Sequence, residues 1–160
     1  MDLKGLVQNG TLISAILMFF GLIIGVLIYR RQMNAQLFLE YTKRYEEIMN
    51  TFPADARDAR LNIDCETPKE SKELTLVILR YLNLSSEEFY LCKNRYLSNK
   101  IWRIWEDELL RTLKSPLLLR EWAKLKHEFE SYPAFSAYVN NAQAKGISGK
   151  RCRTLNSELK

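Results

Sequence analysis

The chain has 160 residues, of which 47% are hydrophobic and 27% charged, and its formal net charge is +5 at pH 7. This length suffices for one compact core besides an apolar segment, so an array of domains is excluded. Three widely spaced cysteines without a CxxC pair predict neither a disulfide framework nor a zinc site, and they indicate free thiols in a reducing compartment.

The most informative segment runs from Gly5 to Tyr29 and carries no charged side chain. A helix over residues 11–29 would be about 28 Å long, close to the hydrocarbon thickness of a bilayer. We therefore predict a transmembrane helix at 11–29 after a short extracytoplasmic N-terminus at 1–10. The alternative is a cleaved signal peptide. It is disfavoured because the run exceeds a usual signal core and because Arg30 and Arg31 stand where a small-residue cleavage site should lie.

Basic residues near the ends of this segment predict its orientation. Arg30 and Arg31 follow the segment directly, whereas Lys4 before it is offset by Asp2. Since the more basic side of a membrane helix faces the cytoplasm, residues 30–160 should be cytoplasmic.

The net charge is concentrated at the two ends of the sequence. Residues 1–33 carry +2, residues 34–144 carry −1, and residues 145–160 carry +4. Because the middle is nearly neutral, nucleic-acid binding is not predicted. We expect a cytosolic domain at 30–144 and a basic disordered tail at 145–160. Anionic lipid attracts basic segments next to a membrane, although a solvated tail without a partner is an open alternative. The predicted membrane-surface residues are Arg30, Arg31, Lys150, Arg151 and Arg153.

Hydrophobic periodicity predicts helices through the whole cytosolic domain. The membrane helix should continue to Phe52, because nothing before Pro53 breaks it. Further helices are expected over 54–61, after Ser71, after Ser98, from Ser115-Pro116, and from Pro133. The fold class is therefore all-α, with one transmembrane helix and a compact bundle of about five helices. The predicted core consists of Tyr45, Ile78, Tyr81, Trp102, Trp105, Leu109, Trp122 and Phe129.

Candidate catalytic and metal-binding residues are few. A di-iron bundle needs two Glu-x-x-His pairs, and the single histidine, His127, has a lysine three residues before it. A Cys92–His127 pair lacks an identifiable third group to orient it. No glycine lies between residues 26 and 145, so a phosphate-binding loop has no place in the domain. We predict no catalytic residue, no metal and no cofactor.

Two features suggest contacts with other molecules. Gly21 and Gly25 form a GxxxG pattern that would let two membrane helices approach closely, which predicts a possible homodimer. Glu87, Glu88 and Trp102 are candidates for a partner or pocket surface. The ordinary alternatives are a solvated acidic face for the glutamates and a core position for the tryptophan.

Several short motifs also carry a family resemblance. They are Arg80–Leu84 leading to Glu87–Tyr90, Trp102 with Trp105, Ser115-Pro116 leading to Trp122, and Phe129 leading to Tyr132-Pro133. Over residues 33–139 the chain resembles an uncharacterised family of small bacterial proteins with one N-terminal membrane helix and a cytosolic helical domain. The resemblance implies this architecture and a place in the bacterial inner membrane, but it implies no activity.

These observations favour a membrane-anchored, non-enzymatic interaction protein. It would act as an accessory or regulatory subunit that binds another protein through the cytosolic helices. Two alternatives stay open. One is a small membrane-bound enzyme that uses Glu87 or Glu88, and the other is a stress or defence effector that perturbs the membrane by oligomerising through Gly21 and Gly25.

Overall fold

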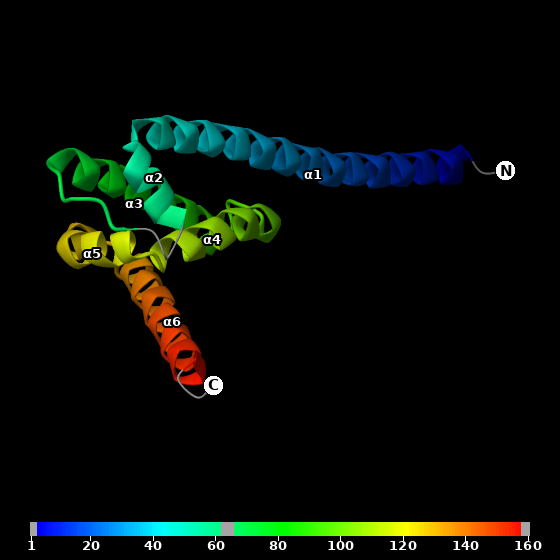
Figure 1. Ribbon diagram of the computed structural model, residues 1–160. Coiled ribbons are helices and arrows are strands. Elements are labelled where there is room, and N and C mark those ends of the chain that lie inside the picture. The colour runs from blue at the N-terminus through cyan, green and yellow to red at the C-terminus, as the bar shows by residue number, and fades with distance from the viewer. Residues whose placement is uncertain (1–2, 62–65, 158–160) are drawn as a thin grey trace. The chain divides into compact units, whose positions relative to one another are not determined.

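The computed structural model describes the backbone of residues 3–61 and 66–157 and the side chains of residues 13–60 and 66–145. The described chain is all-α, as predicted (Figure 1). Its elements are α1 (Leu3–Thr51), α2 (Ala54–Leu61), α3 (Lys72–Lys93), α4 (Asn99–Leu113), α5 (Pro116–Leu125), the 3-10 turn η1 (Lys126–Phe129) and α6 (Pro133–Ser157). The chain divides into two units, Met1–Leu39 and Glu40–Lys160.

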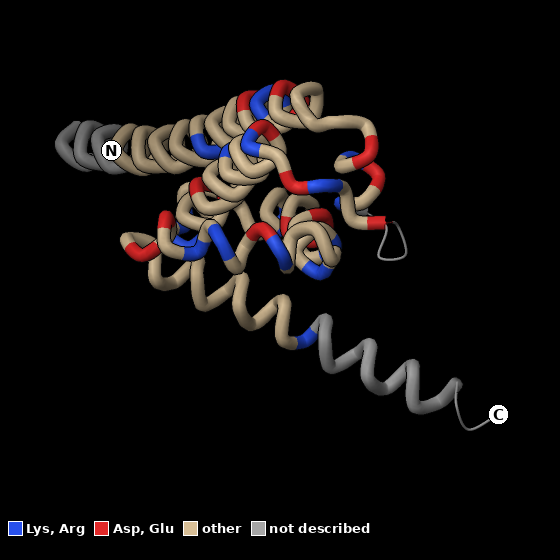
Figure 2. Tube along the Cα trace, turned by 60° about the vertical axis from the view of Figure 1, so that its left-hand side comes forward, with Lys and Arg blue, Asp and Glu red and all other residues tan. Residues whose placement is uncertain are grey.

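The first unit is the N-terminal part of α1. Figure 2 shows no charged residue in the described stretch 13–29, which is followed by the basic pair Arg30 and Arg31. Among the described residues, α1 is the one helix long and apolar enough to cross a membrane, and none of that apolar stretch is buried. Its exposure separates it from a core helix of a soluble protein, whereas a signal sequence near the N-terminus can also meet this criterion of length and composition.

The second unit begins its helices where the sequence predicts them. Ser71, Ser98 and Ser115 are the N-cap residues of α3, α4 and α5, and each side-chain oxygen accepts a hydrogen bond from a backbone N–H three residues later. Such a cap contributes about 1 kcal/mol. Pro116 occupies the first turn of α5, where its missing N–H costs nothing. α1 ends at Thr51, just before Pro53, as expected.

The core of the second unit is formed mainly by α3 to α6, and Tyr41 of α1 and Ala56 and Ala59 of α2 are also buried. Six of the eight predicted core residues are buried there: Ile78, Tyr81, Trp102, Leu109, Trp122 and Phe129. Tyr45 and Trp105 are only half-buried. Aromatic rings fill the space between α5 and the start of α6, where Trp122 contacts Phe129 at 5.4 Å and Phe135 at 6.4 Å between ring centroids. The start of α6 at Pro133 therefore belongs to the core.

α6 continues to Ser157. The basic disordered tail that the sequence analysis places at 145–160 stays a prediction. Gly146 and Gly149 each weaken a helix by about 1 kcal/mol, but neither forbids one, and no proline follows Pro133. The side chains of Lys150, Arg151 and Arg153 lie outside the described residues.

The two tryptophans of unequal burial give a stability prediction. Trp122 is buried, and its Nε1 donates to Oδ1 of Asn140 at 2.9 Å. Trp122→Ala should therefore lower the free energy of unfolding by about 3–5 kcal/mol. Trp105→Ala should lower it by clearly less, because Trp105 is half-buried and its ring faces Tyr41 at 5.6 Å. Thermal unfolding of the full chain in detergent micelles measures both, and equal losses would contradict the burial described here.

Candidate functional site

The strongest polar cluster surrounds the carboxylate of Glu108 on α4. Four side chains from four helices donate hydrogen bonds to it. Tyr81 of α3 donates to Oε2 at 2.9 Å, and Thr112 of α4 and Tyr45 of α1 donate to Oε1 at 3.0 and 3.2 Å. Arg60 of α2 completes the set with a charge-assisted hydrogen bond to Oε1. We call these five residues the Glu108 cluster.

Burial makes the charges in the Glu108 cluster interdependent. The Arg60 side chain is buried, and its guanidinium carbon lies 5.8 Å from the ring centroids of both Tyr45 and Tyr81. Burial, followed by the charge of Glu108, raises the pKa of Tyr81 well above its ordinary value, so its hydroxyl remains a donor. Nε of Arg60 is buried and has no hydrogen-bond partner among the described residues. Losing Glu108 would therefore leave a buried cation without its counter-charge.

Glu87 lies beside this cluster and links α3 to α1. Nη1 and Nη2 of Arg44 donate to Oε2 and Oε1 of Glu87 at 2.6 and 3.1 Å, and the Tyr41 hydroxyl donates to Oε2 at 3.2 Å. The hydrogen bond from Arg44 is the main reason why the pKa of Glu87 is lowered. Glu87 is thus an ionised anchor for the C-terminal end of α1.

Glu88, the next residue, has a different environment. It is only 6% exposed. Burial and the neighbouring charge of Glu108 raise its pKa to about 8, with Arg44 acting in the opposite direction. Glu88 therefore carries a proton at neutral pH. A groove of about 460 Å³ between α1 and α3 is lined by Glu87, Arg44 and Arg80, but not by Glu88.

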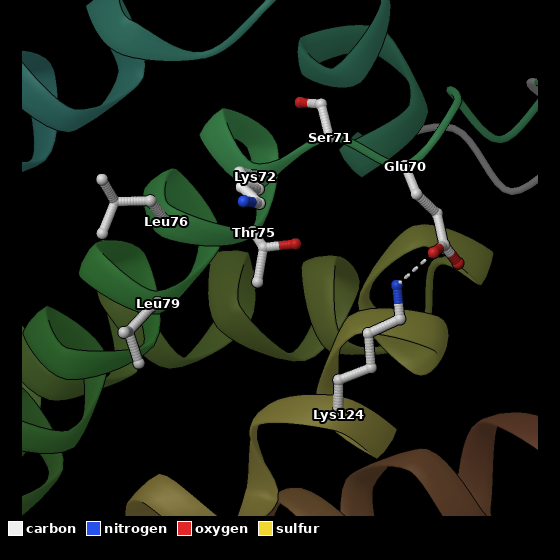
Figure 3. A pocket seen from close by; sticks show the side chains of 7 residues that line it. All are labelled: Glu70, Ser71, Lys72, Thr75, Leu76, Leu79 and Lys124. Atoms are coloured by element: carbon white, nitrogen blue, oxygen red, sulfur yellow. Dashed lines mark ion pairs between the residues drawn. The ribbon is translucent and has the colours of Figure 1, made fainter.

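A second cavity of about 460 Å³ lies at the start of α3 (Figure 3). Figure 3 shows Glu70 and Lys124 facing each other at its edge, where Oε2 and Nζ are 2.8 Å apart. Beside it lies Glu121, which is 0% exposed and accepts hydrogen bonds from Thr75 at 2.9 Å and from Nε of Arg120 at 2.8 Å. The charges around this cavity thus largely neutralise one another.

Glu121 is a residue that the sequence analysis missed. Glu121 lies three residues after Leu118, four after Leu117 and four before Leu125, which places it on the apolar face of α5. Hydrophobic periodicity could therefore have predicted its burial.

A third cavity, which we call the α3–α6 groove, is the most apolar of those described. Its volume is about 370 Å³. Phe89 and Phe135 form its inner wall, with ring centroids 5.8 Å apart. Tyr90 and Tyr132 line it and are 54% and 51% exposed. The remaining lining residues are Ser86, Lys93, Asn94, Ser131, Pro133 and Ala134.

The structure places Trp102 in the core and not on a partner surface. Trp102 is 8% exposed and packs on Phe89 at 6.0 Å and on Tyr138 at 6.2 Å between centroids. Its predicted use as a surface residue is therefore corrected, because its helical face points at other aromatic rings.

The remaining predicted residues lie on the first unit. Arg30 and Arg31 are exposed on α1. A Cβ added to Gly21 or Gly25 would meet nothing within 4 Å, so both positions leave room for a close neighbour. Whether a second copy fills that room stays a prediction.

Metal and thiol chemistry has little support among the described residues. No group of three or more His, Cys, Asp or Glu side chains in the described part of the chain could hold a metal ion. Cys92 is free, and burial and the charge of Glu106 raise the pKa of its thiol, which disfavours a nucleophilic thiolate. His127 lies on the surface beside Glu128, with Nε2 and Oε1 3.1 Å apart. The side chains of Cys65 and Cys152 lie outside the described residues.

Comparison with known proteins identifies no relative. No protein-family model, no curated protein and no solved structure matches the chain. The family resemblance stated from the sequence therefore stays a prediction, and the architecture stands on the helices alone.

The buried carboxyl of Glu88 gives a prediction about pH. Its folded pKa of about 8 exceeds the ordinary value of 4.5, so its contribution to stability is complete below pH 4.5 and is lost as pH rises towards 8. Glu88→Gln keeps the shape without this titration. It should therefore stabilise the fold by about 3 kcal/mol more at pH 8 than at pH 5. Thermal unfolding at the two pH values measures the difference.

The matched control for this experiment is Glu87→Gln on the same helix. It removes the ion pair with Arg44, which is 40% exposed, so it should destabilise the fold slightly at both pH values. A Glu88→Gln effect that does not grow with pH would show that Glu88 is ionised in the folded protein.

The Glu108 cluster gives a second prediction. Glu108→Gln leaves Arg60 buried without a counter-charge and should lower the free energy of unfolding by about 3 kcal/mol. Adding Arg60→Met should recover much of this loss, because the uncompensated charge is then removed. The control is Glu128→Gln at the exposed His127 contact, with an expected effect of about 0.5 kcal/mol or less. Strictly additive losses in the Glu108 and Arg60 variants would show that the two groups do not interact.

Proposed function

We propose that this chain is a membrane-anchored interaction module whose cytosolic helices bind another protein. The proposal rests mainly on the composition of α1. This single helix of 49 residues carries the exposed apolar stretch and then, from Glu40 on, residues that pack within the second unit. Tyr41, Arg44 and Tyr45 make hydrogen bonds there with Glu87 and Glu108. A partner held by the bundle would thus be tethered next to a bilayer.

The direction of insertion follows from the charges beside the anchor. Arg30 and Arg31 lie exposed directly after the apolar stretch, which favours a cytoplasmic second unit and an inner-membrane location. In a bilayer these two arginines would also meet anionic headgroups, at about 1 kcal/mol each. The sequence resemblance to small bacterial proteins with one N-terminal membrane helix supports the same arrangement.

A binding role fits the carboxylates better than a catalytic one. The enzyme alternative needs Glu87 or Glu88 to reach a substrate. Glu87 is engaged by Arg44 and Tyr41, and Glu88 is closed from solvent. Either group would have to leave its structural contacts before it could transfer a proton to a bound molecule.

The effector alternative rests on a different observation, the open space at Gly21 and Gly25. Two copies could cross there at close range, since neither glycine has a side chain. The same crossing could also form a dimer of the interaction module. A dimer at these glycines would therefore fit both the effector and the interaction module.

A membrane extraction experiment tests the anchor. The wild-type chain should stay in the membrane pellet after alkaline carbonate treatment. Leu17→Arg with Ile24→Arg should release it, because each central arginine adds about 2.5–3.5 kcal/mol to the cost of insertion. Leu76→Arg, at an exposed leucine of the bundle, is the control and should leave the chain in the pellet.

Two further measurements complete this test. Mass spectrometry of the mature chain must find residues 1–29 still attached, because their loss would show a cleaved signal sequence. Purification in mild detergent should recover a second protein in stoichiometric amount. Recovery of this chain alone would count against the interaction module.

A further inference from the structure

The corner between α3 and α4 is unusually basic. From Phe89 to Trp105 the sequence has four basic residues and no acidic one, although residues 34–144 as a whole carry −1. The four are Lys93, Arg95, Lys100 and Arg103, and all are exposed. None of them has an ion pair with another described residue. We call these four residues the basic corner.

The backbone turn at this corner holds Arg95 in an unusual conformation. Arg95 has φ 61°, in the left-handed region that glycine or asparagine normally occupies after a helix. The turn is closed by hydrogen bonds from the Asn94 N–H to the Tyr90 carbonyl at 3.0 Å and from the Tyr96 N–H to the Leu91 carbonyl at 2.9 Å. An arginine in this conformation costs about 1 kcal/mol relative to glycine. The turn therefore carries an arginine at a position where glycine would be less strained.

The basic corner adjoins the α3–α6 groove. Lys93 belongs to both, since it lines the groove together with Asn94. The groove offers an apolar inner wall at Phe89 and Phe135 and two exposed tyrosines at its edge. An apolar pocket edged by tyrosine and cationic groups has the composition of a protein-binding hot spot.

We propose that the groove and the basic corner together bind an acidic segment of a partner protein. One large apolar side chain of that segment would enter the groove, and its carboxylates would lie over the four cations. The proposal rests on the interaction function above and names the chemistry of the partner. Charge complementarity favours it, because an acidic segment is attracted here and repelled by the net negative remainder of the domain.

The shape of the site favours a protein over the two other polyanions that a basic surface attracts. A bilayer surface could meet the four cations, but it has no side chain to fill a cavity of 370 Å³. A nucleic acid could place a base against Tyr90 or Tyr132, but residues 34–144 as a whole carry −1 and offer its phosphates no wider basic surface. Lipid or nucleic acid at this site is therefore an outcome that the experiment must distinguish.

Site-specific photo-crosslinking in the full chain, expressed in its native membrane, tests the proposal. Benzoylphenylalanine replaces Tyr132 at the groove, or Leu76 at a distant exposed position as the control. The expected adduct at position 132 is a protein whose crosslinked peptide is rich in Asp and Glu and contains a large apolar residue. No such adduct is expected at position 76.

Two variants then test the two halves of the site separately. Changing Lys93, Arg95, Lys100 and Arg103 to Gln should reduce the adduct at position 132 about tenfold, since four exposed charge pairs are lost. The matched control changes Lys69, Lys72, Lys126 and Lys145 to Gln, which removes the same charge elsewhere and should leave the yield unchanged. Ala134→Trp fills the groove without altering charge and should abolish the adduct. Circular dichroism confirms that each variant is folded.

Each outcome decides the proposal. A lipid or nucleic-acid adduct at position 132 would overturn it. So would an adduct yield that is unchanged when the basic corner is replaced, or an equal protein adduct at position 76. No adduct at position 132, while a partner still copurifies with the wild-type chain, would overturn this site and leave the proposed function standing. If no partner copurifies and no adduct forms, both fail together.

Discussion

The carboxylate of Glu108 is the contact on which the second unit depends, because it receives donors from α1, α2, α3 and α4. α2 has only eight residues, too few to be stable alone, so its position follows largely from the Arg60 contact and from its buried alanines. Removing two charges from water is costly, and the cluster offsets that cost with several hydrogen bonds. Its main effect is therefore to select one arrangement of four helices over others with equally apolar cores.

The glutamates of the bundle show how environment divides one residue type into different roles. Glu87 is ionised and bidentate with Arg44, Glu88 is buried and neutral, and Glu121 is fully buried with Arg120, Lys124 and Thr75 around it. Two adjacent carboxyls with pKa values pushed apart also occur in acid–base catalysis. Here the same separation accompanies helix docking, which is consistent with the binding role proposed above.

The sequence predicts the local parts of this fold well and its long-range polar contacts poorly. Ser71, Ser98 and Ser115 are recognisable as caps because the cap and its N–H are three residues apart. Arg60 and Glu108 are 48 residues apart, and no sequence pattern predicts their contact. Periodicity shows that Trp102 lies on an apolar face, but cannot say whether protein or a partner covers that face. Glu88 did carry a signal, since it lies seven residues after the buried Tyr81 on the same side of α3.

The protonated state of Glu88 also makes proton uptake part of folding. At neutral pH the folded chain holds a proton at this position, whereas an unfolded chain with an ordinary carboxyl has released it. Unfolding therefore delivers nearly one proton to the buffer. The heat absorbed in a calorimeter then contains the heat with which the buffer takes up that proton, so phosphate and Tris solutions of equal pH would give different apparent enthalpies for the same structural event.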